Sequence, residues 1–373
     1  MITLKEVQSK SDLKAFVKFP FKIYKDNPYW VPPIISQEMN SFNKKENPVF
    51  EDAAARLFLA YKGKEIVGRI AAIINWAEVK ESKLKKMRFG WFDFVDDPEV
   101  SKTLLDEVAT IGKANNLDYM EGPVGFSNLD KVGVMTEGFE SKSTMVTWYN
   151  AAYYQKHYEA YGMTIEKGYI ESQFSFSNVN PDFFVKAQAL IKRRYNLRAL
   201  NFKKTSEVMP YVDQMFDLFN TTYAKLSSFV AISDIQKAYF KKKFISFINP
   251  EYIKFVMDDD DNMIAFAIVM PSFADALQKM KGKLFPFGFT HLLHAKKHSK
   301  NVVFYLIGVT PEFQNKGIHA IIFDEYYRTF KEKGIENCFR TPELDDNEAI
   351  HNLWKHFDPK ITKRRKTYRK DLK

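Results

Sequence analysis

The chain has 373 residues, of which 45% are hydrophobic and 27% charged, and this composition excludes a wholly disordered protein. Since a domain has about 150 residues, the length predicts two domains. The net charge is +10, and the single cysteine, Cys338, excludes an intrachain disulfide and a cysteine-cage metal site. The N-terminus has no apolar signal core, and uncharged stretches such as 262–274 are too short to span a membrane. We therefore expect a cytoplasmic protein without a membrane partner.

The first half of the chain predicts two helices and several strands. They are a helix at 11–24, strands at 56–61, 65–73 and 89–95, a helix that begins after Asp97, and a strand at 117–120. Asp97 suits a helix cap, Pro98 suits the first turn, and the charge of Glu99 suits the positive end of the helix. A strand, a helix and a strand with short connections form a βαβ unit, whose two strands are parallel.

The second half repeats this order. It predicts a strand at 197–202, helices at 211–226 and 233–248, strands at 252–257, 263–270 and 302–309, a helix that begins at Gly317, a strand at 335–340, a helix at 347–356 and a last strand at 366–372. The sequence thus predicts an α/β protein (α+β, with mixed sheets) of two similar domains. We place them at 1–190 and 191–373.

Positive charge gathers in two segments. Residues 279–300 contain six lysines and no acid, and residues 360–373 contain eight basic residues against Asp371. These segments are interpreted as a solvated loop and a solvated terminal strand, as the flanks of a pocket for a phosphorylated ligand, or as a nucleic-acid surface. Nucleic acid is the partner that we favour least.

The loop between the strand and the helix of the second βαβ unit carries the most informative pattern. N–H groups at a helix start bind anions, and a glycine there lets a phosphate approach the main chain. Val309, Pro311, Gln314 and Gly317 resemble the V-x-P-x-x-[QR]-x-x-G-x-[GA] loop of the GNAT superfamily of acyl-CoA-dependent N-acyltransferases. His319 departs from that pattern, where Gly or Ala is usual.

A second match lies in the helix expected at 347–356. Asn347, Leu353 and Trp354 resemble the N-x-x-A-x-x-L-Y helix of the same superfamily, with Ile350 in place of a small residue. The tyrosine that protonates the departing CoA thiolate in that family is here Trp354, whose indole cannot supply the proton. His351 shares a helix face with Asn347 and Trp354, which makes it a candidate catalytic residue that shuttles a proton, or else a packing histidine.

The resemblance implies an N-acyltransferase, of the N-acetyltransferase type, with acetyl-CoA as co-substrate and no metal. The cofactor-binding residues that it implies are Val309, Gln314, Asn315, Lys316, Gly317, Ile318, His319 and Asn347. The thioester would lie between the fourth and fifth strands, which splay apart in this family. The amine of a small molecule or peptide would attack it directly, without an enzyme-bound acyl intermediate. A homodimer stays open.

The N-terminal half also resembles this family. Residues 26–33 (DNPYWVPP), with Gly122 and the proline after it, look like a set of two-lobed bacterial GNAT-like proteins, which implies tandem GNAT-like folds. At the helix start of this half, however, Asp96, Asp97 and Glu99 would repel a pyrophosphate. We therefore expect a degenerate N-terminal copy and an acyl-CoA-binding C-terminal copy.

Two other functions stay open: an aminoacyl transferase of the Fem type, which uses charged tRNA, and a two-lobed binding protein without catalysis. Other patterns favour structural roles. His291, His294 and His298 have helical spacing for zinc but no supporting acid, and the aspartates at 258–261 suit a hairpin turn. Cys338 lies in an apolar strand and is expected in the core.

Overall fold

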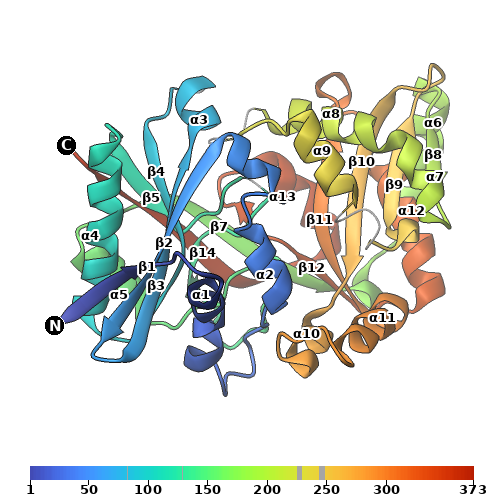
Figure 1. The fold of residues 1–373 in the computed structure, drawn as a ribbon. Helices are drawn as coiled ribbons and strands as arrows, with labels where there is room; N and C mark the ends of the chain where they lie inside the picture. The colour runs from blue at the N-terminus through green and yellow to red at the C-terminus, as the bar shows by residue number, and fades with distance from the viewer. Residues whose placement is uncertain (82, 128, 225–228, 243–247) are drawn as a thin grey trace.

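The computed structural model describes residues 1–81, 83–127, 129–224, 229–242 and 248–373, and it shows two lobes (Figure 1). The strands of the first half are β1 (Ile2–Glu6), β2 (Ala53–Lys62), β3 (Glu65–Asn75), β4 (Lys86–Phe94), β5 (Tyr119–Gly122), β6 (Val134–Glu137) and β7 (Thr164–Ser175). Its helices are α1 (Lys10–Ile23), α2 (Ile35–Ser41), α3 (Trp76–Glu81), α4 (Pro98–Ala114) and α5 (Tyr154–Ala160).

The second half contains the remaining elements. Its helices are α6 (Asp182–Tyr195), α7 (Thr205–Val208), α8 (Val212–Tyr223), α9 (Asp234–Phe240), α10 (Ala274–Met280), α11 (Gly288–His298), α12 (His319–Lys333) and α13 (Glu348–Trp354). Its strands are β8 (Arg198–Asn201), β9 (Ile253–Met257), β10 (Met263–Pro271), β11 (Asn301–Val309), β12 (Asn337–Arg340), β13 (Glu343–Leu344) and β14 (Lys360–Asp371). The predicted helices at 211–226 and 233–248 correspond to α8 and α9, but their parts at 225–226 and 243–247 lie outside the described residues.

One sheet of 14 strands runs through both lobes. Its order is β1-β2-β3-β4-β5-β14-β7-β12-β11-β10-β9-β8, with β6 paired to β14 and β13 paired to β7. The pairs β4–β5 and β11–β12 are parallel, whereas neighbours such as β2–β3 and β10–β11 are antiparallel. The predicted α/β fold with mixed sheets and two βαβ units is therefore confirmed.

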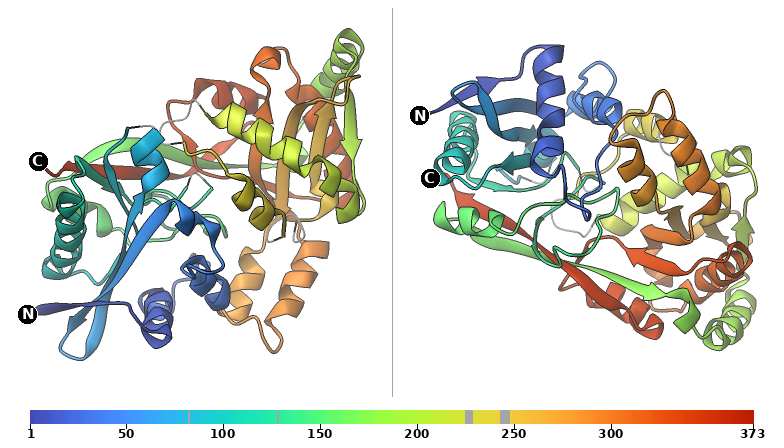
Figure 2. Two further views of the ribbon diagram at one scale, coloured as in Figure 1. Left: turned by 45° about the horizontal axis from the view of Figure 1, so that its top comes forward. Right: turned by 90° about the horizontal axis from the view of Figure 1, so that it is seen from below.

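Helices cover both faces of the sheet in each lobe (Figure 2). In the first lobe α4 buries Leu104 and Val108 against one face, and α1 buries Phe16 and Val17 against the other. In the second lobe α12 and α8 take the corresponding places. The apolar spacing of these helices, read from the sequence, reflects this one-sided burial.

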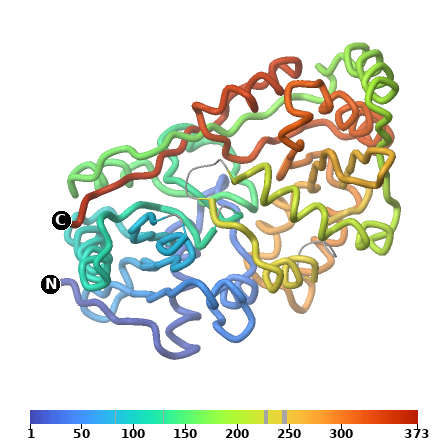
Figure 3. The backbone as a smooth tube through the Cα atoms, turned by 90° about the horizontal axis from the view of Figure 1, so that it is seen from above, coloured from blue at the N-terminus to red at the C-terminus, as the bar shows by residue number. Residues whose placement is uncertain are grey.

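Two long strands join the lobes (Figure 3). β14, at the end of the chain, pairs with β5 and β6 of the first lobe, while β7 pairs with β12 of the second, and the two strands pair with each other. The last strand of the sequence thus completes the sheet of the first lobe. The boundary between residues 190 and 191 stays a prediction.

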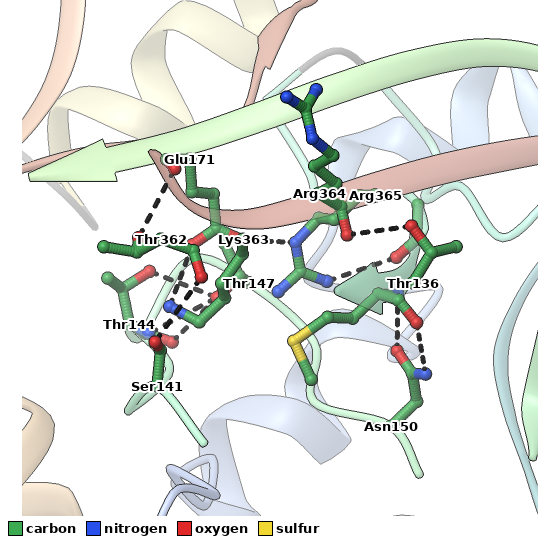
Figure 4. A network of polar contacts seen from close by, with 12 residues as sticks. Thr136, Ser141, Thr144, Thr147, Asn150, Glu171, Thr362, Lys363, Arg364 and Arg365 are labelled. Atoms are coloured by element: carbon green, nitrogen blue, oxygen red, sulfur yellow. Dashed lines mark hydrogen bonds and ion pairs between the residues drawn. The ribbon is translucent and has the colours of Figure 1, made fainter. Parts of the chain in front are cut away.

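A buried ion cluster lies where β7 and β14 meet (Figure 4). Arg365 donates to Glu171, and Lys363 Nζ lies 3.5 Å from Glu171 Oε2 and donates to the carbonyl of Lys142 at 2.9 Å. Glu171, Lys363 and Arg365 are all at most 3% exposed. The interpretation of 360–373 as a solvated strand is therefore wrong for these side chains, because β14 is an inner strand of the sheet.

The lysine-rich segment at 279–300 forms a helical hairpin, α10 and α11, rather than a solvated loop. The hairpin packs against the first lobe, since the Gln278 amide donates to the carbonyls of Pro28 and Trp30 and the Ile35 N–H donates to that of Gly282. Its lysines nevertheless point mostly to solvent. The hairpin therefore ties the two lobes together through contacts other than the strands β7 and β14 (Figure 1).

Candidate functional site

The two parallel strands of the second lobe separate after four paired residues. β11 pairs with β12 from Asn301 to Phe304 and then continues beside β10 alone, while the chain after β12 turns into β13 and pairs with β7. Tyr305 has no partner on β10, so a β-bulge marks the point of separation. Bulges of this kind redirect side chains beside functional sites.

A cavity of about 350 Å³ fills the space between the separated strands and reaches the first lobe. Its second-lobe lining includes Tyr223, Phe304, Tyr305, Leu306, Ile307, Gly308, Val309, Gln314, Glu343, Asn347, Ile350 and Trp354. Of the residues predicted to bind cofactor, the cavity thus brings together Val309, Gln314 and Asn347. The remaining five follow Gln314 directly in the chain.

The loop after β11 leaves main-chain N–H groups without a protein acceptor at the start of α12. Asn315 and Gly317 have left-handed backbones, with φ of 60° and 78°. In the part of the chain that the structure describes, the N–H groups of Asn315, Gly317, Ile318 and His319 donate to no protein acceptor. Four free donors at a helix start form an anion-binding arrangement.

Glycine is required in this loop for two reasons. The φ of 78° at Gly317 is unfavourable for other residues, and a Cβ there would lie 2.9 Å from Ile191 Cδ1. Lys316 does not extend toward the open donors, because its ammonium lies 4.9 Å from the centroid of the Phe313 ring. Any anion at this loop would therefore meet main chain rather than a lysine.

His319 lies at the first position of α12 and is mostly enclosed. Burial lowers the pKa of its imidazole from 6.5 to about 4, and the charge of nearby His356 acts in the same direction. The side chain is therefore neutral at pH 7, and it adds no repulsion or attraction of charge to the loop.

Asn347 and Trp354 shape the inner wall of the cavity. The Asn347 side chain caps α13 by accepting from the Ile350 N–H at 3.2 Å. Trp354 is 1% exposed, its indole N–H donates to Glu343 Oε1 at 3.1 Å, and the Arg340 guanidinium lies 4.9 Å from its ring centroid. Glu343 also accepts from Arg340.

Glu343 is a cavity residue that the sequence did not reveal. Burial raises the pKa of its carboxyl, against the opposing effect of the Arg340 charge. In sequence it looks like one more acid before a helix start, and only the two-residue strand β13 turns it inward. His351, in contrast, contacts the carbonyl oxygens of Leu344 and Asp345 through Nε2, at 3.1 and 3.2 Å, and is not part of the lining described for the cavity. Its proton-carrying role stays a prediction.

The first lobe contributes a charged wall that sequence reasoning also missed. Its members are Lys86, Arg88, Glu121, Asp130, Lys131, Lys167 and Tyr169. Lys86 Nζ lies 2.8 Å from Glu78 Oε1 and 3.1 Å from Glu121 Oε2, and Arg88 binds Glu78 through two nitrogens. These buried pairs fix the wall, since removing one partner would leave an uncompensated buried charge.

Asp130 has a special position in this wall. Its carboxylate accepts from the Ser127 N–H at 2.9 Å. Asp130 lines the cavity and is exposed there, and the protein around it raises the pKa of its carboxyl. Asp130, with Leu129, Tyr305 and Leu306, also borders a second cavity of about 150 Å³. That chamber is largely apolar, with lining from Met215, Phe216, Phe219, Ile232, Phe240, Ile248 and Ile268. The central cavity and the apolar chamber therefore lie side by side and share Asp130 at their border.

Other sequence patterns have structural roles or stay separate from the cavity. Cys338 is buried, and burial raises its thiol pKa. Asp258 accepts from the N–H groups of Asp260 and Asn262, as a hairpin turn requires. The rings of His294 and His298 on α11 are tilted against each other with centroids 4.8 Å apart, and no group of three or more metal-ligating side chains occurs among the described residues. None of the helices within the described ranges is long and apolar enough to cross a membrane.

Comparisons with known proteins agree with this architecture. No family model matches the chain. It is 24% identical over 373 residues to Protein YghO of Escherichia coli (strain K12), covering 98% of this chain and 94% of that protein. It is 25% identical over 319 residues to the Bacterial ceramide synthase of Caulobacter vibrioides, covering 83% and 80%.

Solved structures show the same two-lobed arrangement. A tandem GNAT protein from the clavulanic acid biosynthesis pathway covers 100% of this chain and 99% of its own, with a TM-score of 0.60 and 9% identity. A GCN5-related N-acetyltransferase from Sphaerobacter thermophilus covers 100% and 96%, with a TM-score of 0.56 and 8% identity. The chain therefore has the tandem GNAT fold that its loop and helix motifs resembled.

Proposed function

We propose that this protein transfers an acyl group from acyl-CoA to a primary amine in the central cavity. The observation that carries the proposal is the place of four free N–H donors, those of Asn315, Gly317, Ile318 and His319, directly after Gln314, which lines the cavity between β11 and β12. The donors suit the pyrophosphate of CoA, and the gap beside Val309 suits the pantetheine arm and its thioester. The GNAT fold and the ceramide synthase relative both support acyl transfer.

The amine nitrogen attacks the thioester carbonyl, a C–N bond forms, the C–S bond breaks, and the nitrogen loses a proton. Asp130 is the proposed acceptor of that proton, because it lines the cavity from the first lobe, is exposed there, and has a raised carboxyl pKa. Its negative charge also attracts the ammonium form of the amine. The CoA thiolate leaves and takes a proton from solvent, since Trp354 cannot supply one.

The acceptor that the cavities favour is an amine with an apolar body. The apolar chamber begins at Asp130, so an amine held at this carboxylate could place a hydrocarbon chain among Phe216, Phe219 and Ile268. A ceramide is an N-acylated long-chain amine, and the relative from Caulobacter carries that name. The acetyl group expected from the sequence stays a proposal to be compared with longer acyl groups.

The test is release of free CoA thiol, followed with a thiol reagent, and detection of the amide by mass spectrometry. The protein is mixed with acetyl-CoA or palmitoyl-CoA and with either butylamine or sphinganine. We expect amine-dependent thiol release, with sphinganine preferred over butylamine. Thiol release by neither amine, together with no thermal stabilisation by millimolar CoA, would refute the enzyme. CoA binding without turnover would favour the non-catalytic alternative.

A further inference from the structure

The α10–α11 hairpin presents an apolar tip to solvent. Phe285 and Phe287 are 72% and 74% exposed, Leu293 is 59% exposed and Phe289 39%. We call these four residues the aromatic tip. Soluble proteins seldom expose a compact group of large apolar side chains unless it contacts something.

The exposure is a property of a fixed backbone. The Lys283 N–H donates to the carbonyl of Met280 at 2.9 Å, and the Phe289 N–H donates to that of Leu284 at 2.8 Å. The opposite side of the hairpin is buried, with Met280 and Leu292 packed in a cluster that includes Val31 and Ile34. The tip therefore points outward because the hairpin is anchored on its other side (Figure 2).

Lysines flank these residues on both sides in the sequence. The exposed ones on the hairpin are Lys279, Lys281, Lys283 and Lys297, and residues 279–300 contain no acid. We call them the lysine rim. Phe289, Leu293 and Lys297 follow at intervals of four residues, so they share one face of α11. An apolar centre with cationic ends is the pattern of a segment that lies in a membrane interface.

We propose that the aromatic tip and the lysine rim bind the surface of an anionic lipid bilayer. Aromatic rings favour the level of the lipid headgroups, and lysines near the surface are attracted by anionic lipids. A nucleic acid would also attract lysines, but the four apolar side chains offer it no donor or acceptor for a base edge. This inference goes beyond the proposed function, does not depend on catalysis, and replaces the expectation of no membrane partner.

Vesicle co-sedimentation of the full-length protein tests the proposal. The probes are vesicles of phosphatidylcholine alone and of phosphatidylcholine mixed with phosphatidylglycerol. We expect binding to the mixed vesicles, weak binding to pure phosphatidylcholine, and weaker binding as salt is raised. A Phe285→Ser/Phe287→Ser variant should lower the partition coefficient by about tenfold or more. A Lys281→Gln/Lys283→Gln/Lys297→Gln variant should lower it by roughly a hundredfold, about fivefold for each charge.

The matched control removes exposed apolar side chains elsewhere. Val185 and Leu190 of α6 are 45% and 67% exposed and lie outside the hairpin. A Val185→Ser/Leu190→Ser variant should bind vesicles like the unmodified protein. Absence of binding to the mixed vesicles, or equal losses in the control and the tip variant, would overturn the proposal. So would binding of a single-stranded RNA with higher affinity than the vesicles and its loss in the tip variant. Vesicle binding is compared only between variants that have the same melting temperature as the unmodified protein.

Discussion

The two lobes contain the same βαβ unit, β4-α4-β5 in the first and β11-α12-β12 in the second, and yet the gap between the parallel strands differs. In the first lobe the pairing covers Lys86 to Arg88 of β4, and the chain after β5 then returns into the gap. The Val124 N–H donates to the carbonyl of Phe89 at 2.8 Å, and a Cβ at Gly90 would lie 2.4 Å from the Val124 carbonyl oxygen. Main chain thus occupies the gap.

The N-termini of α4 and α12 also differ in whether they are open to a ligand. In the first lobe the Asp97 carboxylate accepts from the Glu99 N–H at 3.0 Å and pairs with Lys62, so a donor that an anion would need is already used. In the second lobe the N–H groups of Asn315, Gly317, Ile318 and His319 have no protein acceptor among the described residues. In this protein, therefore, the βαβ unit with free N–H donors is the one whose helix start has no capping side chain. It is also the one whose gap between the strands is not occupied by main chain.

The first lobe nevertheless takes part in the site. Its Lys86, Glu121 and Asp130 form one wall of the cavity that β11 and β12 open. We infer a division of labour in which the second lobe binds the donor and the first lobe binds the acceptor. The following predictions test this division between the lobes.

The largest expected effect is on catalysis through the first lobe. Asp130→Asn keeps the shape of the side chain but cannot accept the proton, so kcat should fall by about 10²–10⁴-fold. Because the surrounding protein raises the pKa of the Asp130 carboxyl, the rate of the unmodified protein should rise with pH as this carboxyl loses its proton. The variant should lose this dependence, which pH profiles of kcat would show.

Glu343→Gln is the comparison for Asp130→Asn. Glu343 also has a raised pKa, but it is held by Arg340 and the Trp354 indole. We expect a smaller loss of rate and an unchanged pH dependence. If Glu343→Gln instead removed the pH dependence and Asp130→Asn did not, the base would belong to the second lobe and the division of labour would be wrong.

Donor binding should depend on the second lobe alone. CoA at 100 times its dissociation constant should stabilise the protein by about 2.7 kcal/mol, and Gly317→Glu should abolish this by placing a carboxylate and bulk at the free donors. Gly317→Ala introduces similar backbone strain without the charge and should retain part of the stabilisation. Thermal shifts with and without CoA measure both.

The counterpart in the first lobe is Asp96→Ala/Asp97→Ala. Loss of the Asp97 cap should lower the stability of the free protein by about 1 kcal/mol, but the shift caused by CoA should stay the same. A CoA shift that vanished in this variant and survived Gly317→Glu would reverse the assignment of the lobes.

The fold, and the loop that we propose as the donor side of the site, could be predicted from the sequence because both depend on local patterns. The strands and helices follow apolar periodicity and caps such as Asp97, and the loop from Val309 to His319 is a contiguous segment with its own signature. These features can be recognised in the sequence because each depends on residues that are neighbours along the chain.

The acceptor side was not predictable in this way. Lys86, Glu121 and Asp130 come from three separate segments of the first half and meet Glu343 of the second only through the crossing of β7 and β14. The same crossing buried Lys363 and Arg365, which looked like a solvated basic end. Contacts between segments that lie far apart in the sequence produce no local periodicity or spacing from which they could be predicted.

A smaller effect should distinguish His319 from the glycine or alanine that the GNAT loop usually has. The pKa of His319 is about 4 in the folded protein and 6.5 when exposed, so the imidazole is neutral in both states above pH 6.5. As the pH drops toward 4, the unfolded state takes up a proton that the folded state does not, and the free energy of unfolding decreases. Between pH 7 and pH 5 this costs the folded state about 2 kcal/mol. His319→Ala should remove that part of the acid sensitivity, as denaturant unfolding at the two pH values would show. Equal losses in both proteins would place the titration elsewhere.

Substitutions in the lysine rim should have the smallest effect on stability, and they distinguish acyl-CoA from charged tRNA as the donor. Lys281→Gln/Lys283→Gln/Lys297→Gln should change stability by less than ~0.5 kcal/mol per site, because the three side chains are exposed. If acyl-CoA is the donor, its pyrophosphate contacts the main chain at residues 315–319, so the thermal shift with CoA should be unchanged.

If charged tRNA is the donor, as in the Fem-type alternative, each lost phosphate contact lowers the salt slope of binding by roughly 0.7 to 0.9, and tRNA affinity should decrease strongly. Filter binding of tRNA near physiological salt, measured beside the CoA shift on the same two proteins, separates the two donors. We expect an unchanged CoA shift and no tRNA binding by either protein.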